Sequence, residues 1–146
     1  MKVLAVDTSS LVISVAVVQP EILMAEYVLK QERNHSEKLV PIIEMVMEDI
    51  GEELKNIDVF AVAHGPGSFT GLRIGVSAVK ALAQAFNRPV AGVSTLDGLA
   101  FNMAFAEGLI CPILDARRQQ VYTSVYRWSG HKLTRLEEYM AISVKD

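Results

Sequence analysis

The chain has 146 residues, of which 51% are hydrophobic and 21% are charged, and its formal net charge is −3. This length suits one ordinary domain, or one domain and part of a second. The acidic balance and the lack of a basic run argue against nucleic-acid binding through a broad positive surface of this chain alone. The single cysteine, Cys111, excludes an internal disulfide framework, and its apolar neighbours predict a buried thiol. No stretch approaches membrane-spanning length and nothing marks secretion, so we expect a cytoplasmic protein.

The first third of the chain predicts three antiparallel strands and a helix. Short aliphatic and β-branched runs are separated by polar turns, as in a meander of strands. A charged loop over residues 30–34 follows, and then apolar residues recur at helical spacing up to Gly51, a residue suited to a left-handed helix cap. The expected elements are strands over 3–6, 12–18 and 22–29 and a helix from Ser36 or Glu37 to Ile50.

The middle of the chain centres on a glycine-rich turn over residues 64–75. It joins a strand over 57–63 to a helix over 72–86, and a strand over 90–93 and a helix from Ser94 or Thr95 to about residue 106 come next. Such turns often hold phosphate on helix amides. Here Leu72 stands where a phosphate-binding loop needs lysine, and Ser68 lacks the glycine spacing of a nucleophile elbow. Close helix packing is therefore the favoured interpretation, with nucleotide contact as the alternative.

The order of these elements predicts the fold class. Three strands followed by alternating helices and strands form an α/β, ribonuclease-H-like domain, a mixed sheet with helices on both faces. The opening pattern then recurs, with strands expected over 111–115, 121–126 and 132–142. Two tandem domains of this kind are the architecture of the actin, Hsp70 and sugar-kinase (ASKHA) superfamily. We expect a ribonuclease-H-like N-terminal domain over 1–106 and the beginning of a second, incomplete one over 107–146.

The turn after the first strand is a candidate phosphate site of reduced strength. In the superfamily an Asp-x-Gly-Thr turn wraps the phosphates of ATP, whereas this chain has Asp7-Thr8-Ser9. The side chain of Ser9 occupies the position where glycine allows a close approach. We interpret Asp7 and Thr8 as side-chain caps that end the strand, and the alternative is that Asp7, Thr8 and Ser9 form a vestigial phosphate turn.

The histidines do not form the paired metal site of a His-x-x-x-His helix. Four residues after His35 and His64 stand Leu39 and Ser68, and His131 is isolated in a polar turn. We therefore predict no metal ligand and no catalytic residue. A further polar cluster, Asp115, Arg117 and Arg118, could reach a nucleotide or a partner, although solvation of a hairpin is the favoured interpretation.

The two long helices predict a partner surface. The bulky side of the second helix should face the sheet, and its small residues should form a second, shallow side. The first helix also spreads its apolar residues more widely than one contact needs. The alternative is that each helix packs on the other within one domain. The predicted interface residues are Val40, Met47, Gly71, Ile74, Gly75, Ala78, Leu82 and Ala85.

Five motifs of the chain resemble those of the TsaB family, also called YeaZ, of the bacterial pathway that makes threonylcarbamoyladenosine in tRNA. They are Asp7-Thr8-Ser9 and the stretches HSEKLVP (35–41), GPGSFTGLRIG (65–75), GVSTL (92–96) and LDARR (114–118). The resemblance implies a non-catalytic paralogue of the enzyme TsaD, which it binds as a scaffold or activator. TsaD, with threonylcarbamoyl-adenylate made by TsaC and with the ATPase TsaE, modifies the tRNA.

The same resemblance implies the remaining partners. We expect a homodimer when the chain is alone, contact with a TsaE-like ATPase and with tRNA only through the complex, and no membrane. No cofactor is expected in the isolated chain, and ATP or ADP at a complex interface is left open. Two alternatives belong to other classes: a small ATPase or sugar-kinase-like phosphotransferase, which would need glycine at Ser9, and a metal-dependent transferase like TsaD, which would need the absent histidine pair. Family members are longer than this chain.

Overall fold

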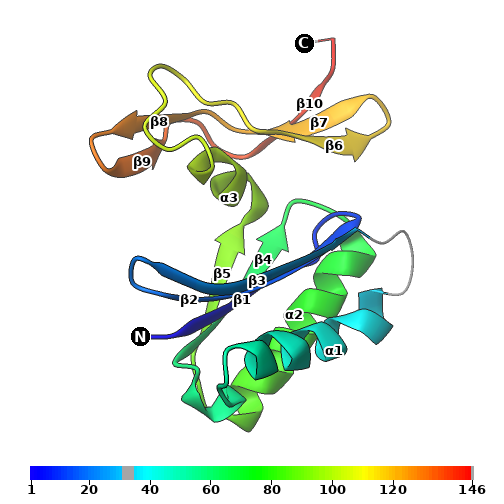
Figure 1. Cartoon of the computed structure of the whole chain (residues 1–146). Coiled ribbons are helices and arrows are strands. Elements are labelled where there is room, and N and C mark those ends of the chain that lie inside the picture. The colour runs from blue at the N-terminus through cyan, green and yellow to red at the C-terminus, as the bar shows by residue number, and fades with distance from the viewer. Residues whose placement is uncertain (31–34, 146) are drawn as a thin grey trace. The chain divides into compact units, whose positions relative to one another are not determined.

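A computed structural model describes residues 1–30 and 35–145, so most of the predicted loop over 30–34 lies outside the described residues. The chain divides into two compact units (Figure 1). The first contains residues 1–64 and 68–93, and the second contains residues 65–67 and 94–146. The predicted boundary at residue 106 separates one ribonuclease-H-like domain from the beginning of a second, and it stays a prediction. No helix within the described ranges is long and apolar enough to cross a bilayer.

The first unit is built on a five-stranded mixed sheet, which confirms the predicted fold class. Its order is β3-β2-β1-β4-β5, with β1 parallel to β4 and antiparallel to β2. Successive side chains of β1 point to opposite faces of the sheet, since Leu4 and Val6 are buried while their neighbours are half-buried. The strands are β1 (Val3–Asp7), β2 (Val12–Gln19), β3 (Ile22–Lys30), β4 (Val59–Gly65) and β5 (Val90–Ser94).

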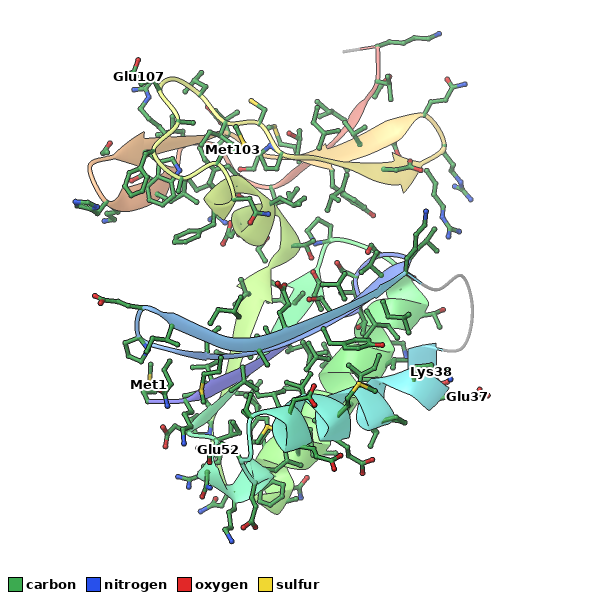
Figure 2. The ribbon with its side chains drawn as sticks, viewed as in Figure 1. Met1, Glu37, Lys38, Glu52, Met103 and Glu107 are labelled. Atoms are coloured by element: carbon green, nitrogen blue, oxygen red, sulfur yellow. The ribbon has the colours of Figure 1, made fainter. Side chains whose placement is uncertain are left out.

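The helices α1 (His35–Asp49) and α2 (Phe69–Ala85) cover the same face of this sheet (Figure 1). The prediction of helices on both faces is therefore met in this unit on one face only. Gly51, at φ 65°, ends α1 as predicted, and a short 3-10 helix (Leu54–Asn56) follows. Glu37 and Lys38 lie in the first turn of α1, at its N-terminal end (Figure 2). Buried residues of α1 recur at helical spacing: Leu39, Ile42, Ile43, Val46 and Met47.

The described residues of the second unit form one short helix and two small antiparallel sheets, of order β10-β7-β6 and β8-β9. Its helix is shorter than the predicted range to residue 106, and Met103 and Glu107 lie on the loop that follows it (Figure 2). Cys111 is exposed, which corrects the predicted buried thiol. The elements are α3 (Thr95–Phe101), β6 (Ile113–Arg117), β7 (Gln120–Thr123), β8 (Tyr126–Ser129), β9 (Lys132–Arg135) and β10 (Met140–Ser143).

Two predicted strands of this unit, 121–126 and 132–142, are each broken into two. The breaks meet each other: the Ser124 hydroxyl donates to the Glu137 carbonyl at 2.7 Å, and the Leu136 N–H donates to the Val125 carbonyl at 2.7 Å. Ser124 is fully buried, so this link replaces regular strand pairing at a point that hydrophobic alternation does not mark.

The core of the second unit forms around α3. Leu96, Ala100, Ile110 and Tyr126 are its buried members, and the Tyr126 hydroxyl donates to Asp97 Oδ1 at 2.7 Å. Burial, and then this hydrogen bond, raise the pKa of Tyr126. The sequence favours Ser94 or Thr95 as the side-chain cap of α3, and this prediction is wrong, because Ser94 makes no cap hydrogen bond and the Thr95 hydroxyl has no hydrogen-bond partner among the described residues.

Candidate partner-binding surface

The start of α2 is fixed by Ser68, and the helix begins at Phe69, three residues before the predicted start. Its hydroxyl oxygen accepts a hydrogen bond from the Gly71 N–H at 3.3 Å, as an N-cap does. Its own N–H donates to the Ser9 carbonyl at 2.7 Å. The turn after β1 therefore anchors the first turn of α2.

Thr8 extends this contact along the helix. It is fully buried, and its hydroxyl donates to the Gly71 carbonyl at 2.7 Å. A Cβ added at Gly71 would lie 2.0 Å from the Thr8 carbonyl oxygen, and one added at Gly75 would lie 2.3 Å from Thr8 Oγ1. Both glycines are thus required for close packing of α2 within the first unit, as the favoured interpretation of the glycine-rich segment predicts.

Gly71 and Gly75, predicted to line an open shallow side, are buried inside the unit, and so is Met47, which is 4% exposed. This corrects the prediction for these three residues. The buried stripe of α2 has glycine at its first two positions because the turn at Thr8 leaves no room there for a side chain. Its members are Gly71, Gly75, Val79 and Ala83.

The predicted phosphate turn is tied to its own surroundings. Asp7 Oδ1 accepts the Ser9 N–H at 2.7 Å, and Ser9 is 6% exposed. With Thr8 bound to α2, Asp7 and Thr8 act as the strand-end caps of the favoured interpretation. Nucleotide binding at this turn stays a prediction.

An open groove lies between α1 and α2 in the first unit. Its volume is about 420 Å³. Apolar walls dominate it, and Val40 is 50% exposed at its edge. The guanidinium carbon of Arg73 lies 5.4 Å from the centre of the Phe69 ring, which is itself 74% exposed. The lining residues are Ser36, Leu39, Val40, Thr70, Arg73, Ile74, Ser77 and Ala78.

Three of the eight predicted interface residues, Val40, Ile74 and Ala78, line this groove. Of the others, Ala85 is exposed further along α2 and Leu82 is half-buried against the core. Thr70, Arg73 and Ser77 also line the groove but were not predicted, because only apolar and small residues were chosen as interface residues. Their spacing of three and four residues along one helix face was the signal that could have added them.

The remaining candidate residues do not converge on one site. The His64 ring lies beside Gly92, where an added Cβ would be 2.9 Å from it, and His131 meets Phe105 edge-on at 5.7 Å. The His35 side chain lies outside the described residues. Across the part of the chain that the structure describes, no three His, Cys, Asp or Glu side chains gather in a metal-binding arrangement.

Comparison with known proteins identifies the family. A family model described as TsaD, tRNA N6-adenosine threonylcarbamoyltransferase, matches residues 23–146. The tRNA threonylcarbamoyladenosine biosynthesis protein TsaB of Bacillus subtilis is 38% identical over 136 residues, which cover 93% of this chain. YeaZ from Pseudomonas aeruginosa superposes with a TM-score of 0.88 at 30% identity, covering 97% of this chain and 67% of that one. The chain belongs to the TsaB (YeaZ) family.

Membership of the TsaB family confirms the resemblance predicted from the motifs. A more distant structure, the ROK hexokinase from Thermus thermophilus, has a TM-score of 0.53 at 16% identity and shares the fold alone. The chain spans 59% of the length of Bacillus subtilis TsaB and 62% of the TsaB protein of Escherichia coli.

Proposed function

We propose that this chain is a non-catalytic subunit in the biosynthesis of threonylcarbamoyladenosine in tRNA, and that it binds and supports a TsaD-like enzyme in the cytoplasm. The names of the curated TsaB relatives support the pathway, and the match to the TsaD family model supports a partner of similar fold. The open groove between α1 and α2 is the observation that carries the proposed mode of binding.

The groove suits a helix of the partner. Ala78 and Ser77 carry little side-chain volume, so a facing helix can approach α2 closely. Val40, half exposed at the edge, would lose its remaining water contact, and complete burial of a valine side chain contributes about 1.5–3 kcal/mol. Binding would therefore gain roughly half of that at this one position. A second copy of the chain would use the same groove when no TsaD-like enzyme is present.

The non-catalytic role is supported by the way the turn after β1 is used. Thr8 and Ser9 direct their hydroxyl and carbonyl groups to α2, so the turn holds the helices that form the groove. In this proposal the chemistry, and contact with a TsaE-like ATPase, belong to the assembled complex. ATP or ADP would bind only at an interface of that complex.

Reconstitution tests the proposal. The chain, a TsaD-like enzyme and both together are supplied with threonylcarbamoyl-adenylate, a TsaE-like ATPase and unmodified tRNA, and the modified adenosine is measured. The proposal predicts product from the pair at a higher rate than from the enzyme without the chain, and none from the chain without the enzyme. Turnover by the chain alone, or no stimulation of the enzyme, would contradict it.

A further inference from the structure

The tip of the β6–β7 hairpin in the second unit has an unusual backbone for its residues. Arg117, Arg118 and Gln119 adopt φ angles of 64°, 52° and 61°, and Arg117 pairs with Gln120 across the tip. Residues other than glycine and asparagine adopt this left-handed region only at a cost, and hairpins of this kind favour Asn-Gly. Backbone strain of this type concentrates at functional sites. The tip thus holds two arginines in a place where other residues would be easier to accommodate.

The two arginines have no anionic partner within the described ranges. The nearest carboxylate in sequence, Asp115, accepts the backbone N–H of Arg117 at 2.7 Å, and so helps to shape the turn. Both guanidinium groups are therefore available to bind an anion from outside the chain.

A third cation lies at the same end of the sheet. In β10, Ser143 pairs with Gln120, and the Val144 N–H then donates to the Gln119 carbonyl at 2.9 Å. This contact places the exposed Lys145 next to the hairpin tip. The basic tip, defined as Arg117, Arg118 and Lys145, is thus held together by backbone pairing.

The charge balance of the units favours this site over the rest of the chain. The second unit has six basic and six acidic residues, so the net charge of −3 belongs to the first unit. The overall charge, which argues against a broad nucleic-acid surface, leaves room for a local one in the neutral unit.

We propose that the basic tip binds the phosphodiester backbone of an RNA strand, with about one phosphate for each cation. The proposal rests on the proposed function, which supplies RNA as the substrate, and it replaces the expected indirect contact with a direct one. Guanidinium groups match phosphate oxygens with paired hydrogen bonds. Contacts of this kind position a strand without reading its sequence.

The salt dependence of binding gives a direct test. A fluorescent single-stranded RNA of mixed sequence is titrated with the chain, and the dissociation constant is followed by anisotropy. Each neutralised phosphate adds about 0.7 to the slope of the logarithm of the dissociation constant against the logarithm of the salt concentration. Three contacts therefore predict about 20-fold weaker binding at roughly 200 mM salt than at roughly 50 mM. The Arg117→Gln/Arg118→Gln variant should bind RNA more weakly at low salt, and its affinity should fall only about threefold over that range of salt concentration.

A matched variant controls for net charge. Arg127→Gln/Lys132→Gln removes two exposed cations from the β8–β9 hairpin of the same unit. It should keep the 20-fold salt dependence. Equal loss in both variants, or an unchanged salt dependence in the arginine variant, would overturn the proposal.

Competition separates the possible anions. Inorganic phosphate and a glutamate-rich peptide should displace RNA only at much higher concentration than unlabelled RNA does. Displacement by the peptide at equal charge would show a protein site instead, and displacement by phosphate at equal concentration would show a small-anion site. The arginine variant should still bind the TsaD-like enzyme, because the groove belongs to the first unit. Loss of RNA binding with enzyme binding retained therefore separates failure of this proposal from failure of the proposed function.

Discussion

Gly75→Ala tests the packing that sets the position of α2. Replacing a helical glycine by alanine usually stabilises an exposed helix by about 1 kcal/mol. At Gly75 the new methyl group would lie 2.3 Å from Thr8 Oγ1 and 3.6 Å from the nearest side-chain carbon of Val62. The first contact is too close for any real Cβ and the second is ordinary. The clash therefore depends on one hydroxyl.

The magnitudes follow from these contacts. Overpacking a core costs about 1–3 kcal/mol, and the gain in helix propensity offsets about 1 kcal/mol of this, so Gly75→Ala should destabilise the first unit by up to about 2 kcal/mol. Thr8→Ala alone should cost about 1 kcal/mol through loss of its bond to the Gly71 carbonyl. In the Thr8→Ala background the hydroxyl is gone, and Gly75→Ala should become neutral or stabilising by up to about 1 kcal/mol.

Gly71→Ala provides the matched comparison. Its Cβ would meet the Thr8 carbonyl oxygen at 2.0 Å, and this backbone atom remains after Thr8→Ala. Its cost should therefore persist in the Thr8→Ala background. Urea unfolding followed by far-ultraviolet circular dichroism measures all five variants, since most of the helical signal comes from α1 and α2. The reasoning fails if Gly75→Ala costs as much with alanine at position 8 as with threonine.

Three further predictions concern other parts of the chain. Met47→Ala should destabilise the first unit by about 2–5 kcal/mol, whereas Val40→Ala, half exposed, should cost less than about 1 kcal/mol, and equal costs in urea unfolding would contradict the burial of Met47. Tyr126→Phe should lower the stability of the second unit by about 0.5–1.5 kcal/mol, and an unchanged thermal melt of that unit would count against its buried hydrogen bond. A hydrogen bond from Lys2 holds the pKa of Glu52 below its ordinary value. The stability that this bond contributes is complete above the ordinary pKa and is lost as the pH falls through the lowered pKa. Glu52→Gln should therefore flatten the fall in Tm between about pH 5 and pH 3, and an equally steep fall would refute the pairing.

The strands and helices of the first unit could be predicted because local patterns determine them. Alternation marks β1 and β2, and Gly51 marks the end of α1. Which side of α2 faces the sheet could not be predicted in this way. Gly71 suits both an open docking surface and close internal packing, and the choice is made by Thr8, 63 residues earlier in the chain.

The second unit was harder to predict for a similar reason. The break between β7 and β8 depends on the bond from Ser124 to the Glu137 carbonyl, a contact 13 residues apart that leaves no local pattern. The groove was predicted only in part because its polar residues, such as Arg73, look like a solvated stripe when the position of α1 is unknown.

Isothermal titration of a TsaD-like enzyme with two charge variants of α2 shows whether the enzyme docks in the groove between α1 and α2. Ala78→Glu places a carboxylate in the groove, where burial without a partner costs roughly 1–3 kcal/mol. Gln84→Glu adds the same charge at an exposed position outside the residues that line the groove. Ala78→Glu should fold normally and bind the enzyme at least about fivefold more weakly, while Gln84→Glu should bind like the unmodified chain. Equal binding of the two variants would contradict docking through the α1–α2 groove.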